Sequence, residues 1–183
     1  MARPRSRYVS FSQSDSILGF SLPEELKRYH VKLAVDPQTL RTAQQKGERV
    51  IMVNGKPQVM HYVKTPIRES RQRTMAAIRA VFPVVVRPPD ANHPWQMIAV
   101  YRYHPKGLTK DMLGQYKMTS PDLDNLVKDL KDCITRTGVA WEDDRQVVIE
   151  SASKMYVCSL DEPAHVELKL VQLPIKKQKD IEE

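Results

Sequence analysis

The arrangement of apolar and polar positions predicts one strongly amphipathic helix in the second half of the chain. After Pro121, apolar residues recur every three or four positions, which is the spacing of a helix that buries one face. These residues are Leu123, Leu126, Val127, Leu130, Cys133 and Ile134. Pro121 favours an extended conformation before the helix, and Gly138 suits the left-handed position that follows a helix. We therefore expect a helix between Pro121 and Gly138.

Shorter apolar runs predict a β-sheet and a second long helix. Asn54-Gly55 lies between two β-prone runs and is the strongest short signal for a hairpin turn. Residues 95–103 are apolar and aromatic, which is typical of a central strand. Further strands are expected at 30–35, 146–157 and 164–173, and helices at 21–28, 36–47 and 66–82. This order of elements predicts an α+β fold in which helices pack on a mixed β-sheet.

The length and composition of the chain limit its organisation and its setting. A chain of 183 residues suffices for one domain. We divide it into an N-terminal extension (1–45), a main domain (46–175) and a charged tail (176–183). The sequence contains no apolar run of membrane-spanning length and no secretory signal pattern. Its two cysteines form neither a disulfide framework nor a metal-binding pattern, so we expect a cytoplasmic protein.

Positive charge makes nucleic acid the expected partner. The formal net charge is +7 and the sequence pI is about 9.4, and basic side chains that neutralise phosphates release counterions. The candidate DNA contacts are Arg68, Arg71 and Arg73 on the 66–82 helix and Lys117 before the main helix. The sequence has no glycine-rich phosphate loop, so no nucleotide cofactor is expected. Its five histidines show no metal-ligand spacing.

Acidic residues are concentrated at the two ends of the predicted main helix. The five carboxylates are Asp122, Asp124, Glu142, Asp143 and Asp144. Asp122 and Asp124 can converge only if Asp122 lies at or before the N-cap, because helical residues two apart point in different directions. Lys128 is four residues from Asp124 and shares its face. Each feature also has an ordinary explanation, as a cap, an i,i+4 pair or a turn residue. Together, five carboxylates within 23 positions repel one another unless a cation neutralises them, which favours a divalent metal.

The residues of this region resemble the signature of a known family. Pro-Asp-Leu-Asp-Asn-Leu-x-Lys at 121–128, followed by Gly-x-x-Trp-x-Asp-Asp-x-Gln-Val at 138–147, closely resembles that of RusA-type Holliday-junction resolvases. The close match continues to about Lys154, and a weaker match of element order reaches back to about Thr65. The resemblance implies a RusA-like fold and a Mg²⁺-dependent endonuclease, for which Mn²⁺ is an alternative ion.

The resemblance also implies roles for individual residues and a partner. The catalytic set would be Asp122, Asp124, Lys128 and Asp144. Its three carboxylates would hold the metal, with Asp143 as an additional candidate ligand. Glu142 lies outside the family pattern and is expected to be exposed. A homodimer would resolve four-way junctions by paired symmetric nicks during DNA recombination and repair, at the nucleoid, and a phage or prophage is one source of such a protein.

Two other functions are compatible with the residues. Asp122 could pair with Glu167 and Lys169 in a restriction-type nuclease site, although this leaves the Asp124, Lys128 and Asp144 positions without a role. Alternatively, the protein could bind branched DNA without cleaving it. The leading hypothesis instead requires the acidic groups from both ends of the main helix to meet in space around divalent ions.

Overall fold

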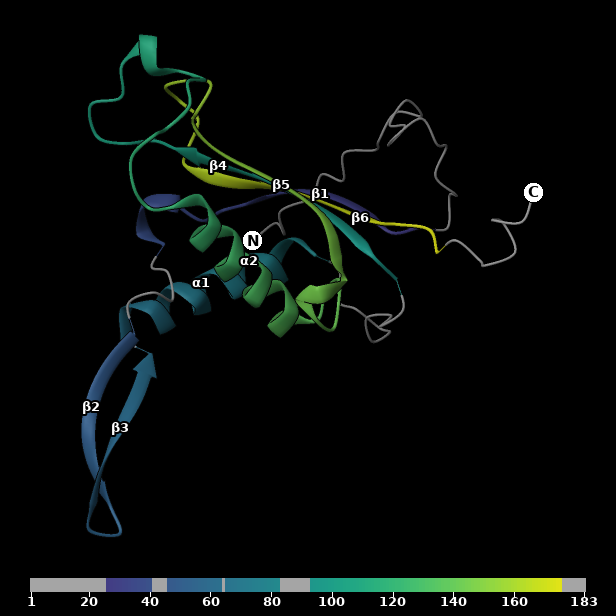
Figure 1. Ribbon diagram of the computed structural model, residues 1–183. Coiled ribbons are helices and arrows are strands. Elements are labelled where there is room, and N and C mark those ends of the chain that lie inside the picture. The colour runs from purple at the N-terminus through teal and green to yellow at the C-terminus, as the bar shows by residue number, and fades with distance from the viewer. Residues whose placement is uncertain (1–25, 41–45, 64, 83–92, 176–183) are drawn as a thin grey trace, which may run out of the picture.

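The computed structural model describes residues 26–40, 46–63, 65–82 and 93–175. A four-stranded mixed sheet carries two helices on one face, and a separate two-stranded hairpin extends away from the helices (Figure 1). The predicted α+β fold with helices packed on a mixed sheet is therefore confirmed. The first 25 residues of the predicted N-terminal extension and the C-terminal tail lie outside the described residues, as does most of the helix predicted at 21–28.

The main sheet has the strand order β1-β6-β4-β5. Its strands are β1 (Arg28–Leu33), β6 (His165–Gln172), β4 (Trp95–Tyr103) and β5 (Val147–Tyr156). β6 is antiparallel to both of its neighbours, whereas β4 and β5 are parallel. Every second side chain of β4 is buried beneath the helices, so the predicted central strand at 95–103 is confirmed. β1 comes from the segment predicted as an extension, and it forms an edge strand of the sheet.

Helix α2 (Leu123–Thr137) is the amphipathic helix predicted from the apolar spacing. Five residues of the predicted stripe are buried: Leu126, Val127, Leu130, Cys133 and Ile134. The helix ends at Gly138, whose φ of 67° is the left-handed conformation expected there. Because α2 joins the parallel strands β4 and β5, it runs back along the sheet in the opposite direction to both. Its first turn therefore lies near the end of β5, and its last turn lies near the start of β5.

Helix α1 (Thr65–Val81) is joined to α2 by a buried ion pair. The Nε of Arg71 donates to Oδ1 of Asp129 at 2.6 Å, and its Nη2 donates to Oδ2 of Asp132 at 3.0 Å. Desolvation raises the pKa of Asp129 more than Arg71 lowers it. Burial also disfavours the charged guanidinium, but Asp129 and Asp132 outweigh this and raise the pKa of Arg71. Arg71 was predicted to contact DNA; it is instead buried between the two helices, where it is not accessible to a phosphate.

The hairpin consists of β2 (Lys46–Val53) and β3 (Lys56–Val63). Asn54 and Gly55 form its two-residue turn with φ angles of 51° and 73°, and the paired positive values confirm the predicted hairpin turn. Gly47 was predicted to end a helix that starts near Asp36. The described part of that segment holds only a 3-10 turn at Pro37–Thr39, and Gly47 itself lies in β2. The predicted helix end at Gly47 is therefore wrong, because Lys46 and Gly47 pair with Val63 and Tyr62 of β3, while residues 41–45 lie outside the described residues.

Candidate active site

The start of α2 presents three charged side chains to solvent. Asp122 is the N-cap, with the extended backbone angles φ −66° and ψ 143°, and it makes no capping hydrogen bond. Asp124 lies in the first turn and Lys128 one turn further, and all three side chains are exposed. Among the residues that the structure describes, none of these three side chains forms a hydrogen bond or an ion pair. The ordinary explanations, a cap and an i,i+4 salt bridge, are therefore not realised here.

Several other charged groups of α2 are paired. Asp129 and Asp132 receive hydrogen bonds from Arg71, and Lys131 forms an ion pair with Glu150 of β5 at 2.7 Å. Asp122, Asp124 and Lys128, which have no such partner in the described part of the chain, therefore differ from the structural ion pairs of the same helix. Two carboxylates at a helix N-terminus are favoured by the helix dipole, and their oxygens remain available to an external cation.

Two lysines support the turn that precedes Asp122. Nζ of Lys154 donates to the carbonyl oxygens of Thr119 and Pro121 at 2.8 and 2.7 Å. Nζ of Lys117 donates to Oγ1 and the carbonyl oxygen of Thr119 and to the carbonyl oxygen of Ser120. Lys117 also lies 4.7 Å from the centre of the Tyr103 ring. Burial, together with the nearby Lys154, lowers the pKa of Lys117.

These contacts change the interpretation of both lysines. Lys117 was a candidate DNA contact, but its ammonium is already used within the protein to hold residues 119 and 120. Lys154 was not assigned a role from the sequence, although the segment that resembles the family signature extends to this residue. Its hydrogen bonds to the residues before Asp122 make it a positioning residue for the start of α2.

The second acidic group precedes β5 in a short 3-10 turn at Asp144–Gln146. The Asp143 carboxylate accepts hydrogen bonds from the backbone N–H and the Nε of Arg145, at 2.9 and 2.8 Å. These contacts lower the pKa of Asp143. They also show that its side chain serves as the N-cap of the 3-10 turn. Asp144 is half-buried and is not used as the cap, whereas Glu142 is exposed, as expected.

The remaining residues of the later motif have structural roles. Oε1 of Gln146 accepts from the backbone N–H groups of Glu142 and Asp143, and its Nε2 donates to the carbonyl oxygen of His93. Trp141 is fully buried, donates from Nε1 to Oγ1 of Thr135 at 2.9 Å, and packs edge to face on Trp95. Together they hold the Asp144 turn between the end of α2 and the sheet.

Helix α2 separates the two acidic groups within one chain. Its 15 residues span about 22 Å at about 1.5 Å per residue. Lys154 ties the Asp122 end to the late part of β5, whereas Asp144 lies just before Val147, the first residue of β5. The expectation that the acidic groups meet within one chain is therefore wrong, because a straight helix keeps its two ends apart.

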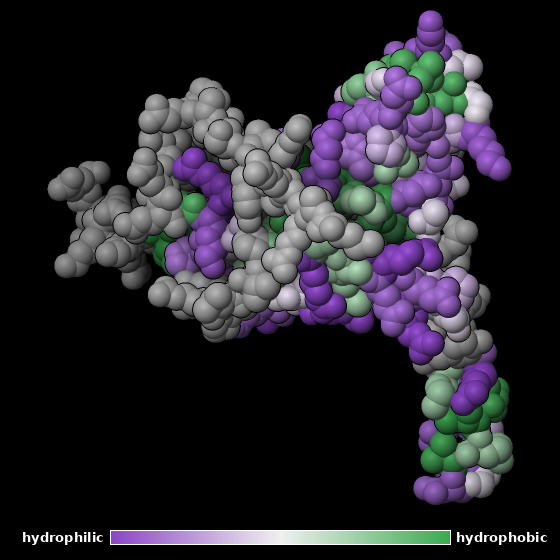
Figure 2. Space-filling view, turned by 180° about the vertical axis from the view of Figure 1, so that it is seen from behind, coloured by the Kyte–Doolittle hydropathy of each residue, from purple (hydrophilic) through white to green (hydrophobic). Residues whose placement is uncertain are grey.

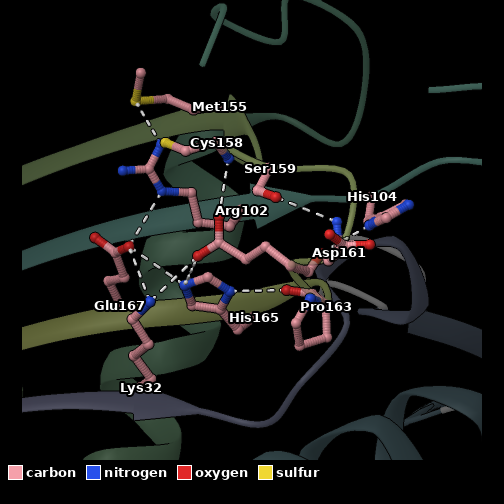
Figure 3. Close-up of polar contacts among 11 residues, drawn as sticks. Lys32, Arg102, His104, Met155, Cys158, Ser159, Asp161, Pro163, His165 and Glu167 are labelled. Carbon is pink, nitrogen blue, oxygen red and sulfur yellow. Dashed lines mark hydrogen bonds and ion pairs between the residues drawn. The ribbon is translucent and has the colours of Figure 1, made fainter. Parts of the chain in front are cut away.

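One tight group of metal-compatible side chains occurs in the described residues, at a different place. Glu162, His165 and Glu167 offer ligand atoms within 4.8 Å of one another. Lys32 and Arg102 reach the same carboxylates, at 3.2 Å from Glu162 and 3.3 Å from Glu167 respectively (Figure 3). These two cations balance the two carboxylates, which identifies the group as an ion-pair network that ties β1, β4 and β6 together.

This network also bears on the restriction-type alternative. Glu167 alternates along β6 with Val166 and Leu168, whose side chains are buried beneath the helices. Its side chain therefore points to the opposite face of the sheet from α2 and Asp122. Glu167 is also paired with Arg102 and His165. A site that combines Asp122 with Glu167 and Lys169 is disfavoured by this geometry.

Two of the arginines predicted to contact DNA remain accessible. Arg68 and Arg73 are exposed on α1, in contrast to Arg71. They lie on the helix that directly follows the hairpin.

Comparison with known families agrees with the motif. A family model described as endodeoxyribonuclease RusA matches residues 1–170 of the 183-residue chain. No curated protein matches the chain significantly. In the described part of the chain, no helix has the length and apolar character needed to cross a bilayer.

Proposed function

Because the chain belongs to the RusA family of endodeoxyribonucleases, we propose that it is a Mg²⁺-dependent endonuclease that resolves four-way DNA junctions. The observation that carries this proposal is that Asp122, Asp124 and Lys128 at the start of α2 are exposed and have no hydrogen bond or ion pair with the described residues. Neighbouring charges on the same helix are paired within the protein. Unpaired groups of both signs are what a site for a metal ion and a phosphate requires.

The chemistry of these residues fits a hard divalent cation. Asp122 and Asp124 provide exposed carboxylate oxygens, which Mg²⁺ and Mn²⁺ accept as ligands. The ion would lower the pKa of a water molecule and neutralise charge on the phosphate during hydrolysis. Lys128, one turn from Asp124, would donate hydrogen bonds to the non-bridging phosphate oxygens. Asp144 would complete the set of carboxylates, whereas Asp143 is used as a cap.

The separation of the acidic groups favours a site made from two copies of the chain. Within one copy, about 22 Å of helix lies between Asp122 and the turn that carries Asp144. A two-fold axis perpendicular to α2 and near its middle would place the Asp122 end of one copy beside the Asp144 end of the other. The homodimer would then contain two equivalent sites, each with Asp122 and Asp124 from one copy and Asp144 from its partner.

Such a dimer also suits the proposed substrate. A four-way junction is resolved by two nicks in strands that are related by two-fold symmetry, and a two-fold dimer places two identical sites accordingly. The exposed Arg68 and Arg73 of α1 would contact phosphates of the duplex arms. We place this activity in DNA recombination and repair at the nucleoid, and a phage or prophage source is compatible with it.

A synthetic four-way junction, labelled on each strand, tests the proposal. Wild-type protein with Mg²⁺ should produce paired nicks at symmetric positions, and EDTA should abolish them. Asp122→Asn should bind the junction without nicking it. Binding by the wild-type protein with no nick in Mg²⁺ or Mn²⁺ would instead support the alternative of a branched-DNA-binding protein.

A further inference from the structure

The hairpin β2–β3 leaves an apolar face uncovered. In the observed register, Val50 pairs with Val59 and Met52 pairs with Pro57, so these four side chains share one face. Val50 and Met52 are each 67% exposed and Val59 is 59% exposed. Figure 2 shows hydrophobic side chains on the surface of the hairpin, which projects from the body of the domain. Soluble proteins seldom leave such a contiguous apolar surface without a partner.

The hairpin projects as an arm of its own. Its eight-residue strands reach about 27 Å at about 3.4 Å per residue. It belongs to a two-stranded sheet of its own and pairs with no strand of the four-stranded sheet. β3 leads through one residue into α1, which anchors the base of the arm. An isolated hairpin gains little stability by itself in water, so its length and exposure indicate that it serves an external contact.

The charge of the arm indicates what that contact is. Residues 46–63 contain three cationic side chains and one carboxylate. Arg49 and Lys56 lie on the face opposite the apolar one, where they can reach backbone phosphates, whereas the carboxylate of Glu48 lies on the same face as Val50 at the base of the arm. The adjoining helix adds the exposed Arg68 and Arg73. An arm with an apolar face and a surplus of positive charge is complementary to nucleic acid, whose phosphates attract the cations while its bases offer apolar faces.

We propose that the hairpin is a DNA-engaging arm whose Met52–Pro57 pair inserts against unstacked bases at the branch point of the substrate. This inference rests on the proposed function and concerns how branched DNA is selected. Met and Pro are among the side chains that proteins wedge between base steps, and they lie here directly opposite each other near the tip. Wedging into a continuous duplex requires unstacking, whereas stacking at a branch point is already interrupted. The arm therefore favours branched DNA over linear duplex.

The test measures binding separately from cleavage, in an Asp122→Asn background with Mg²⁺. Met52→Thr is compared with Met60→Thr, which makes the same substitution on the opposite face of the same hairpin, where Met60 pairs with Arg49. We expect Met52→Thr to weaken binding to a four-way junction about tenfold, which is the size of one lost stacking contact. Its affinity for linear duplex should stay within about twofold of the parent's. Met60→Thr should change neither. A 2-aminopurine base at the branch point should brighten on binding of the parent protein and of Met60→Thr, but not of Met52→Thr.

Two results would overturn the inference. If Met52→Thr binds junction and duplex as the parent does, the tip does not engage the branch point. If Met52→Thr converts a dimer to a monomer in sedimentation, the apolar face covers a second copy of the chain instead of DNA. Both results leave the nicking activity of the wild-type protein as a separate observation. Only the absence of that activity would contradict the proposed function itself.

Discussion

Nζ of Lys154 lies 2.7 Å from the carbonyl oxygen of Pro121, the residue directly before Asp122. The same ammonium donates to the carbonyl oxygen of Thr119 at 2.8 Å. Strand β5 thus fixes the backbone from which Asp122 projects, while the other acidic group lies before the first residue of the same strand. This arrangement underlies the division of the proposed site between the two ends of α2.

Replacing Lys154 should impair cleavage more than binding. Lys154→Met removes both hydrogen bonds to the turn, so Asp122 loses its fixed position relative to Asp124. We expect the nicking rate to fall about tenfold or more, since catalysis depends strongly on exact placement. Junction affinity, measured in Ca²⁺, should remain within about threefold of the wild-type value. This corresponds to a change in binding free energy well under the 1.4 kcal/mol that a tenfold change represents.

Lys131→Met is the matched control for Lys154→Met. It removes a lysine that also joins α2 to β5, through the Glu150 ion pair, but touches neither Thr119 nor Pro121. Its nicking rate should be close to that of the wild type. Equal losses in the two variants would indicate that Lys154 acts only through general packing of α2 on the sheet.

Lys128 should contribute mainly to the chemical step. Its ammonium has no partner among the described residues, so its removal leaves no buried charge unpaired. Loss of one preorganised donor to a phosphate should lower the single-turnover nicking rate of Lys128→Ala about 100-fold or more. Lys128→Arg keeps the charge and should retain more activity. An unchanged rate in Lys128→Ala, with folding intact, would remove Lys128 from the proposed site.

Arg71 should affect stability, because it is a buried structural residue. Arg71→Met leaves the Asp129 carboxylate buried without its partner, which typically costs about 3–5 kcal/mol of unfolding free energy. The exposed neighbour Arg73 provides the control, and Arg73→Met should change stability by less than about 0.5 kcal/mol. Denaturant unfolding monitored by circular dichroism measures both. Replacing Asp129 by Leu in the Arg71→Met variant should recover part of the loss, and a further loss would contradict this account.

The ion-pair network on the other face of the sheet should make stability depend on acid. Burial acts to raise the pKa of Glu167, but hydrogen bonding from His165 and the charge of Arg102 outweigh it, so the pKa lies below the ordinary value of 4.5. A carboxyl group with a depressed folded pKa contributes stability above its unfolded pKa, and loses it as the pH falls through the folded value. The temperature of half-unfolding should therefore decrease as the pH is lowered below about 4.5. In Glu167→Gln this decrease should be smaller. Parallel curves for the two proteins would show that Glu167 does not contribute.

Local signals in the sequence were enough for much of the fold. Asn54-Gly55 specifies its turn through positive φ angles, and the apolar spacing from Leu123 to Ile134 specifies one buried helix face. Residues 95–103 were identified as a central strand because they are apolar and aromatic, and the structure then showed that alternate side chains of this strand are buried. In each case the information lies within a few residues of the chain.

Contacts between distant segments could not be predicted in the same way. Arg71 carries a charge that local spacing assigns to a solvent face, yet Asp129, 58 residues away, allows it to be buried. Lys154 acquires its role only when β5 is placed against the start of α2. The convergence of Asp122 with Asp144 was expected from their shared acidity, but the rigid length of α2 prevents it within one chain. The assignment of these carboxylates as metal ligands stays a prediction.

Mixing two inactive variants tests the two-copy site most directly. Asp122→Asn and Asp144→Asn should each be inactive alone. If each site takes Asp122 from one copy and Asp144 from its partner, a mixed dimer has one doubly altered site and one intact site. Nicking of the four-way junction should then return on mixing, with single nicks replacing the paired nicks of the wild type. If subunit exchange is demonstrated and the mixture stays inactive, each site lies within one chain and the account is contradicted.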